Sequence, residues 1–351
     1  MNRTLLQGVR VIELAGLAPV PHCGMVLADF GASVTLIEKP NDKDETAMEQ
    51  RLAGRKTLQG LDLRFSEDLA KLRQLCRDSD VLLDPYRPGV LEKMGLDPVE
   101  LLEENKGLVV CRLTGYGQTG PLAQEAGHDI NYVAITGLLP TISGHSCRRP
   151  TPPVNLLADF AGGGLTAAFG IVAALLKREK NGGHGCIIDC SMSEGLSYLA
   201  SFVRRYYDIE HLWTQPYAAF SGDCPIYRQV CLTYETKDKK WVAVGALEPK
   251  FNSTLFEILG MDKNMADMYA DPAGITAEME QIFKSRTRDE WMTLFEGKNA
   301  CVSPVLNLDE AVQFRHNIER ENFVKEGNKC FPQPAPRMYT KEEFKKLKSR
   351  L

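Results

Sequence analysis

The chain has 351 residues, more than a single hydrophobic core usually accommodates, so we expect two domains. Hydrophobic residues make up 44% of it and charged residues 25%, as in an ordinary globular enzyme. The net charge of -4 excludes the broad basic field of nucleic-acid-binding proteins, so we expect no nucleic-acid partner. No apolar run approaches the roughly 20 residues of a membrane helix, and a strand pattern begins by about Val9. We therefore expect a soluble protein with neither a secretory signal nor a membrane span.

The segment from Val9 to about Asp189 alternates short β-branched runs with amphipathic stretches, a pattern typical of a parallel α/β sheet. The predicted strands cover residues 10–14, 33–38, 57–63, 81–84, 108–114 and 186–190. The predicted helices between them cover residues 21–29, 66–77 and 98–105, with Ser66 and Asp97 as N-caps.

A further helix, largely buried, is expected from Asp159 to about Lys180, because apolar residues occupy nearly every side of it. It starts with Gly162, Gly163 and Gly164, which are poor helix formers. Either a ligand approaches the backbone there or another helix packs closely against it.

The composition changes after Ser191. Residues 192–220 are rich in aromatic side chains, which include Tyr198, Phe202, Tyr206, Tyr207, Trp213 and Tyr217 and indicate a connector packed against another part of the protein. Residues 225–300 predict a smaller α+β unit, with strands at 229–234 and 241–245 and helices at 251–259, 275–283 and 288–295. The Pro- and Lys-rich tail from Pro332 is expected on the surface.

No cofactor or metal is expected. The segment 15–21 after the first strand lacks both the G-x-G-x-x-G of dinucleotide sites and the G-x-x-x-x-G-K of nucleotide triphosphatases. The ten cysteines are scattered without a C-x-x-C pair or a His/Cys ladder, so we expect reduced thiols and no metal site. Side chains alone would then carry any chemistry.

His128 is the most informative histidine, because it lies between Gly127 and Asp129 after a Gly/Gln-rich loop that follows a strand. Ligands of such sheets bind outside the carboxyl ends of the strands. His128 is therefore either a catalytic base or a structural hydrogen-bond donor.

Asp159 is either an N-cap or a carboxylate that faces a ligand. Its place at a helix start offers backbone N–H groups that favour an oxyanion. Glu248 follows an apolar strand and precedes a helix, so it is a functional carboxylate, a cap or a solvated charge. Arg55, Lys56 and Arg87 are candidates for phosphate contact, with surface charge as the alternative.

These segments resemble the α-methylacyl-CoA racemase family within the class III CoA-transferase superfamily. The resemblance covers nearly the whole chain, in residues 23–32, 86–90, 113–118, 127–132, 155–164, 185–195, 243–249 and 303–305. The segments around His128 and Asp159 are the specific ones. The chain departs from the usual pattern at Val20-Pro21-His22.

The resemblance implies epimerisation at C2 of a 2-methyl-branched acyl-CoA without metal or organic cofactor, for branched-chain fatty acid or bile-acid-type oxidation. His128 and Asp159 would be the two bases, Glu248 would hydrogen-bond the imidazole, and Asp129 would help to hold the histidine loop. Contacts to coenzyme A are expected from Arg55, Lys56, Arg87 and Gly127.

The family fold implies a large Rossmann-like domain from residues 1–190 and 325–351, an aromatic helical linker at 191–220, a small α+β domain at 221–305 and a return linker at 306–324. Two chains would interlock as a homodimer, with Glu248 reaching the site of the partner. The ending Ser349-Arg350-Leu351 resembles the S-K-L type signal, which predicts the peroxisomal import receptor as a partner and a peroxisomal, or also mitochondrial, location.

Two other functions fit the same residues. A class III CoA-transferase would use Asp159 as a nucleophile, although the His128 segment favours the racemase. A non-catalytic acyl-CoA-binding protein would keep the fold without turnover.

Overall fold

The computed structural model describes residues 5–40, 52–143, 150–206, 208 and 231–348. The chain divides into two compact units. The first comprises Met1–Leu138, Pro152–Phe202 and Pro334–Leu351, and the second comprises Leu139–Thr151 and Val203–Gln333. Residues 191–202 thus belong to the first unit and 325–333 to the second, which differs from the boundaries expected from the sequence.

A six-stranded parallel sheet forms the centre of the first unit, in the order β3-β2-β1-β4-β5-β6. The strands are β1 (Arg10–Leu14), β2 (Ser33–Glu38), β3 (Thr57–Gly60), β4 (Val81–Asp84), β5 (Val109–Thr114) and β6 (Cys186–Ser191). This confirms the predicted sheet, although β3 ends three residues early. Asp62 ends it, because its Oδ1 accepts a hydrogen bond from the N–H of Arg64 at 3.1 Å and turns the chain.

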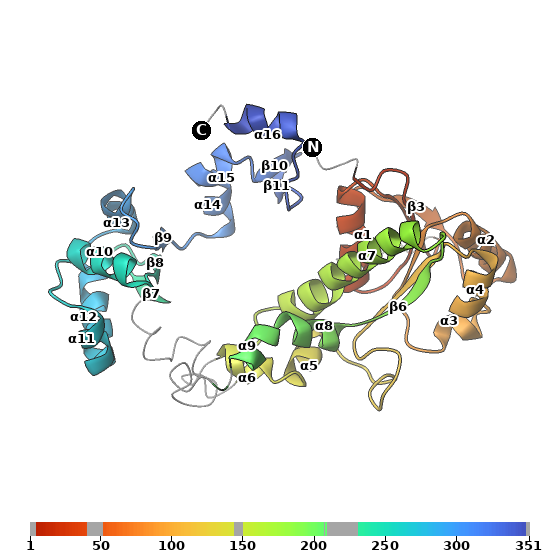
Figure 1. Cartoon of the computed structure of the whole chain (residues 1–351), viewed down its shortest axis with the longest axis horizontal. Helices are drawn as coiled ribbons and strands as arrows, with labels where there is room; N and C mark the ends of the chain where they lie inside the picture. Colours follow the sequence, from red (N-terminus) through yellow and green to blue (C-terminus); the bar gives the residue numbers. More distant parts are fainter. Residues whose placement is uncertain (1–4, 41–51, 144–149, 207, 209–230, 349–351) are drawn as a thin grey trace. The chain divides into compact units, whose positions relative to one another are not determined.

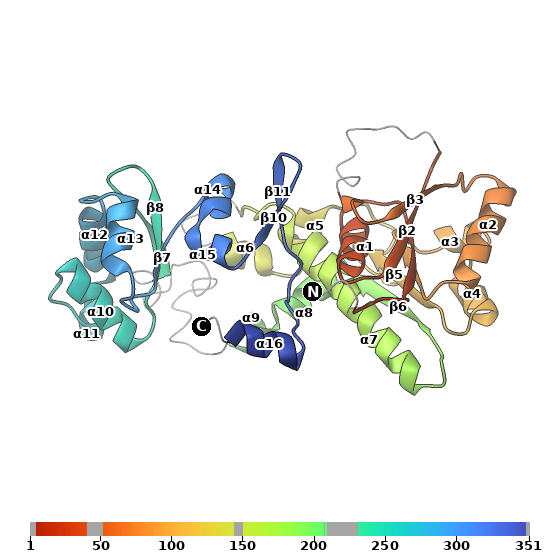
Figure 2. The same cartoon turned by 90° about the horizontal axis from the view of Figure 1, so that it is seen from above.

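Helices cover both faces of this sheet (Figures 1 and 2). On one face lie α1 (Pro19–Asp29) and α7 (Thr166–Lys180); on the other lie α2 (Ser66–Arg77), α3 (Val90–Lys93) and α4 (Pro98–Glu104). The second face buries a continuous core that includes Ile12, Leu72 and Leu82. β4 and β5 are buried along their whole length, which explains their mostly apolar sequences, and the buried Arg112 of β5 pairs with Asp84 at the end of β4 at 2.9 Å.

The helix starts follow local chemistry. Pro19 begins α1, two residues before the predicted start, because the fixed φ of proline suits a first turn. Asp97 caps α4 as predicted, since its side chain accepts from the N–H of Val99 at 2.8 Å. The prediction that Ser66 caps α2 is wrong: Phe65 takes the extended N-cap conformation and Ser66 is already helical.

The expected helix from 159 to 180 is two elements, a π-helix η2 (Leu156–Leu165) and then α7. The prediction that it is largely buried is wrong for the single chain, in which the side chain of Phe169 is 75% exposed. Among the described residues this segment is also the one helix long and apolar enough to cross a membrane, contrary to the sequence-based expectation. That is weak evidence for a span, because core helices share this length and composition.

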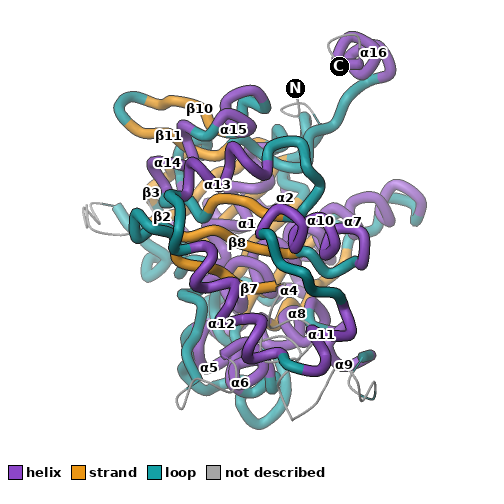
Figure 3. Tube along the Cα trace, turned by 90° about the vertical axis from the view of Figure 1, so that its left-hand side faces the viewer, coloured by secondary structure: helices purple, strands orange, loops and turns teal. Residues whose placement is uncertain are grey.

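The second unit contains a three-stranded antiparallel sheet of β7 (Cys231–Glu235), β8 (Trp241–Gly245) and β9 (Val302–Pro304). Its helices are α10 (Pro249–Leu259), α11 (Met265–Ala270), α12 (Pro272–Phe283) and α13 (Arg288–Phe295), shown in purple in Figure 3. Its core packs Phe283 against Tyr234 and Trp291. The predicted strand at 241–245 and helix at 288–295 are confirmed, and residues 229–230 of the other predicted strand lie outside the described residues.

The remaining elements are α5 (Asp129–Ala134), α6 (Leu138–Ser143), α8 (Met192–Leu199), α9 (Ser201–Arg205), α14 (Leu308–Gln313), α15 (Arg315–Glu319), the hairpin β10 (Phe323–Glu326) and β11 (Lys329–Pro332), and α16 (Lys341–Lys348). Tyr198 of the aromatic connector is exposed, whereas Tyr207, Trp213 and Tyr217 lie outside the described residues. Residues 349–351 also lie outside them. The tail after Pro332 is mostly exposed, as predicted.

Two glycines give a direct test of how η2 packs on α8. A Cβ at Gly195 would lie 2.0 Å from the backbone oxygen of Gly162, so Gly195→Ala should push the two helices apart and lower the free energy of unfolding by about 1–3 kcal/mol. Gly170 is the matched control, because its nearest neighbour would be 3.8 Å away. Gly170→Ala should raise stability by about 0.5–1 kcal/mol. Urea unfolding of both variants measures this, and equal effects would contradict the close crossing.

Candidate active site

A cavity of about 510 Å³ opens at the carboxyl ends of β1, β4 and β5. Its walls come from residues 16–20 after β1, 85–87 after β4 and 113–116 at the end of β5, together with side chains from α5 and η2. The strand order reverses between β1 and β4, and open α/β sheets bind ligands at such a switch point. All the lining residues belong to the first unit.

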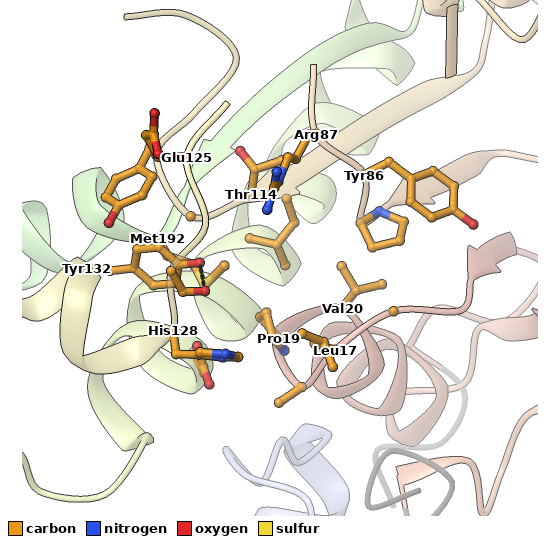
Figure 4. A pocket seen from close by; sticks show the side chains of 18 of the residues that line it. Leu17, Pro19, Val20, Tyr86, Arg87, Thr114, Glu125, His128, Tyr132 and Met192 are labelled. Carbon is orange, nitrogen blue, oxygen red and sulfur yellow. Dashed lines mark hydrogen bonds between the residues drawn. The ribbon is translucent and has the colours of Figure 1, made fainter. Parts of the chain in front are cut away.

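His128 and Asp159 both line this cavity. His128 immediately precedes α5 in an extended conformation, and its N–H donates to Oδ1 of Asn131 at 3.1 Å. Figure 4 shows its ring reaching toward Pro19 and Leu17. The fold therefore brings these two candidate side chains, singled out from the sequence, to one cavity from segments about thirty positions apart.

Tyr132 holds the backbone beside His128. Its hydroxyl donates to the carbonyl oxygen of Gly127 at 2.5 Å, the bond drawn in Figure 4, and its ring meets Tyr116 edge-on at 4.9 Å. Burial raises the pKa of Tyr132 to about 12, so the hydroxyl keeps its proton. A Cβ at Gly127 would lie 2.8 Å from this ring. Sequence reasoning assigned no role to Tyr132, although an aromatic residue in the first turns of the helix that follows His128 is close enough along the chain to contact the preceding loop.

Asp129 joins the histidine segment to η2. Its side chain is buried, and Oδ2 accepts hydrogen bonds from the N–H groups of Ala158 at 2.7 Å and Asp159 at 3.0 Å. This contact fixes one candidate base against the backbone of the other. The expectation that helix-start N–H groups next to Asp159 await an oxyanion is wrong for these two, because Asp129 already occupies them.

Asp159 is not the N-cap of its helix, since Asn155 holds that position and Asp159 lies in the first turn. Its Oδ2 accepts from Nδ2 of Asn155 at 3.2 Å. Burial raises the pKa of Asp159, and the charge of Asp129 raises it further, while Asn155 and His128 act in the opposite direction. The carboxylate is therefore a stronger base than an exposed one.

Other parts of the protein occupy the space beside the glycines that follow Asp159. A Cβ at Gly162 would meet backbone atoms of Met192 and Leu196 at 2.9 and 2.8 Å, and one at Gly164 would meet Nδ1 of His22 at 2.5 Å. Of the two explanations for these glycines, close helix packing is confirmed and an approaching ligand is not.

The three basic candidates differ in their surroundings. Arg87 lines the cavity and donates to the carbonyl oxygen of Gln124 at 3.1 Å. Arg55 is not in the wall and pairs with Asp29 at 2.9 Å. Lys56 is fully enclosed, with its ammonium on Glu13 at 2.7 Å, so it offers no free ammonium for a phosphate contact.

Glu248 belongs to the second unit, where it is exposed and occupies the N-cap position of α10 without a side-chain capping bond. No group of three His, Cys, Asp or Glu side chains within the described residues could hold a metal ion. The cysteines described with their side chains are free thiols, and Cys23, Cys76, Cys111 and Cys190 are buried.

The fold and site define a doubly wound α/β protein with a base-bearing cavity at its switch point. Residues 6–348 match CoA-transferase family III, and the chain belongs to this family. It is 54% identical over 345 residues to a CaiB/baiF CoA-transferase family protein of Caenorhabditis elegans, covering 98% of both chains. It is 44% identical to mouse alpha-methylacyl-CoA racemase, covering 95% of this chain and 86% of the relative. A crystal structure of a CAIB/BAIF family protein from Brucella suis aligns with a TM-score of 0.79 at 23% identity, covering 96% and 93% of the two chains, and supports the fold.

The surroundings of Asp159 predict opposite pKa shifts in two variants. Asn155→Ala removes a hydrogen bond that favours the carboxylate, so the pKa of Asp159 should rise. Asp129→Asn removes a neighbouring negative charge, so the pKa should fall. Titration of the Asp159 carboxyl carbon by NMR, with aspartate labelled by carbon-13, measures both. Shifts of the same sign would contradict this account of the site.

Proposed function

We propose that this protein epimerises 2-methyl-branched acyl-CoA thioesters at C2 by two-base proton transfer through an enolate. The observation that carries the proposal is the placement of His128 and Asp159 in the wall of one cavity. The relatives named alpha-methylacyl-CoA racemase, at 44% identity in mouse and 43% in human, support the substrate class.

The reaction needs two groups of unlike chemistry. The thioester carbonyl acidifies the neighbouring C–H, one base takes the proton, and the conjugate acid of the other returns a proton to the opposite face. Burial raises the pKa of the Asp159 carboxyl, so its carboxylate is a stronger base, and both an imidazole and a carboxyl group can gain and lose a proton. Either group can then serve as base or acid, which allows the reaction to run in both directions.

The supports around the two bases fit this proposal. Asp129 fixes the backbone of Asp159, Asn155 holds its carboxylate, and Tyr132 holds the peptide before His128. Fixed reacting groups convert an intermolecular proton transfer into an effectively intramolecular one. No cofactor is required, because the substrate itself carries coenzyme A. Arg87 in the cavity wall is the basic residue best placed for a contact to it, with Gly127 beside the thioester.

A class III CoA-transferase that uses Asp159 as nucleophile is the second candidate. The same cavity carboxylate favours it, and a relative at 28% identity is named succinyl-CoA--D-citramalate CoA-transferase in Chloroflexus aurantiacus. This reaction has no role for an imidazole opposite the carboxylate. His128 is therefore the residue that separates the two candidates.

Deuterium incorporation at C2 tests the proposal. Wild-type protein in heavy water should exchange the C2 hydrogen of both epimers of a 2-methylacyl-CoA without any acceptor acid. His128→Ala and Asp159→Asn should each slow exchange by about 10²–10⁴-fold. His184→Ala is the control, because this histidine is exposed and outside the cavity.

Three other outcomes are informative. Transfer of coenzyme A to a free carboxylic acid without C2 exchange would establish the transferase instead. Binding of the thioester with neither reaction would indicate a non-catalytic acyl-CoA-binding protein. Exchange that survives both cavity substitutions would overturn the assignment of the two bases.

We also propose that the protein acts as an interlocked homodimer in which Glu248 of one chain reaches His128 of the other. An apolar stripe along η2 and α7 supports this proposal. Leu165, Phe169, Val172 and Leu176 recur at helical spacing and are all exposed in the single chain. Contiguous exposed apolar surface of this kind is characteristic of an interface.

A charge on this stripe should separate the chains. We expect Phe169→Glu to convert the dimer to a monomer, because a carboxylate would be buried without a partner. Phe65→Glu is the matched control, since Phe65 is a similarly exposed phenylalanine before α2 and off the stripe. Light scattering after size-exclusion chromatography gives the mass of each. A monomeric wild type would contradict the proposal, as would a Phe169→Glu variant that stays dimeric.

A further inference from the structure

A buried ion pair between Glu13 and Lys56 lies close to the cavity wall that residues 16–20 form, and the proposed reaction does not use it. Glu13, at the end of β1, has a fully buried side chain, and the side chain of Lys56 is 1% exposed. The Lys56 ammonium donates to Oε1 of Glu13 at 2.8 Å and lies 2.7 Å from Oε2. Gly24 of α1 leaves the space for this carboxylate, because a Cβ there would overlap Oε2.

Stability alone is a weak reason for such a pair. Burial raises the pKa of Glu13 to about 7 in spite of Lys56, and burial also lowers the pKa of Lys56. Desolvation of two charges commonly cancels their attraction, so well-packed apolar side chains would serve the core as well. The pair can instead fix the positions of several groups at once, because the ammonium has three N–H donors and can hydrogen-bond to more than one acceptor.

The second hydrogen bond of the Lys56 ammonium leads to the wall of the cavity. Lys56 donates to the carbonyl oxygen of Pro21 at 2.8 Å, in the first turn of α1. The residues just before it, Leu17 to Val20, line the cavity. Lys56 therefore ties the end of β1, through Glu13, to the turn that forms this wall.

The same turn contacts the helix that carries Asp159. A Cβ at Gly164 would meet the backbone oxygen of Pro19 at 3.0 Å, so the two backbones approach closely there. The ring of His22 packs edge-on against Phe160 with centroids 5.0 Å apart. Burial and Lys56 lower the pKa of His22, so it packs as a neutral ring. A shift of the first turn would therefore reach Phe160, the neighbour of Asp159.

We propose that Lys56 is a positioning residue, which sets the first turn of α1 against η2 and thereby the place of Asp159 in the cavity. Its kinetic consequence rests on the proposed racemase function, whereas its structural consequence does not. Lys56 acts through Pro21 and His22 and does not itself contact the substrate.

Two substitutions separate the tie to Pro21 from the ion pair. Lys56→Met removes the donor and the positive charge that lowers the pKa of Glu13, so the buried Glu13 takes up a proton and leaves no unpaired charge. Glu13→Gln removes the charge but keeps an oxygen that accepts from Lys56, so the bond to Pro21 survives. We expect the turnover number for C2 exchange to fall by about 10–100-fold in Lys56→Met and by less than about threefold in Glu13→Gln. Lys56→Gln, too short to reach both partners, gives the same test if the methionine variant does not fold.

Titration of the Asp159 carboxyl by NMR is the readout that a merely structural role would not move. The charges that act on Asp159 are those of Asp129 and His128, so a shift in Lys56→Met reports displacement of the carboxylate. Leu72→Ala is the control for lost stability, since Leu72 is buried on the opposite face of the sheet.

The inference would be overturned if Lys56→Met showed the same Asp159 titration and the same turnover number as the control Leu72→Ala. It would also be overturned if Lys56→Met and Glu13→Gln lost turnover equally. Absence of exchange in the wild type would instead overturn the proposed function, and the titration would still decide the role of Lys56.

Discussion

The site depends on one carboxylate that does not face the cavity. Asp129 accepts two backbone hydrogen bonds from the start of η2, and it directly follows His128 in the chain. One buried side chain therefore fixes the segment that carries His128 against the segment that carries Asp159, the two proposed bases. A charged acceptor with two N–H donors is stronger than a neutral hydrogen bond, and it leaves η2 little freedom to slide.

Close backbone contact supplies the rest of this rigidity. Gly162 lies against α8, and Gly163 and Gly164 lie against α1. The part of η2 that directly follows Asp159 is therefore packed between these two helices. A π-helix is a rare conformation that recurs at functional sites, and here its first turn carries the cavity carboxylate. Leu165 at the end of η2 and Phe169, Val172 and Leu176 of α7 are apolar and exposed in the single chain. The continuous segment of η2 and α7 thus contributes to the cavity and also carries the surface of the proposed dimer.

The sequence predicted the sheet of the first unit well, because β4 and β5 are short, mostly apolar runs between helices with clear starts such as the cap Asp97. It also singled out His128 and Asp159, which occupy one cavity. It did not reveal Tyr132, whose hydrogen bond to Gly127 depends on the fold of the loop. It also placed Lys56 among the phosphate ligands, because nothing in the local pattern shows that Lys56 forms an ion pair with Glu13 in the folded protein.

By itself the sequence determined the order of strands and helices, the family, and which residue types could move a proton. These properties depend on local periodicity and on residues adjacent in the chain. Tertiary structure decided which polar groups are already engaged: Asp129 fills the amides of Ala158 and Asp159, α8 fills the space at Gly162, and Glu13 holds Lys56. Partners separated by tens of residues meet only after folding, so no local pattern records whether a charge is free or satisfied.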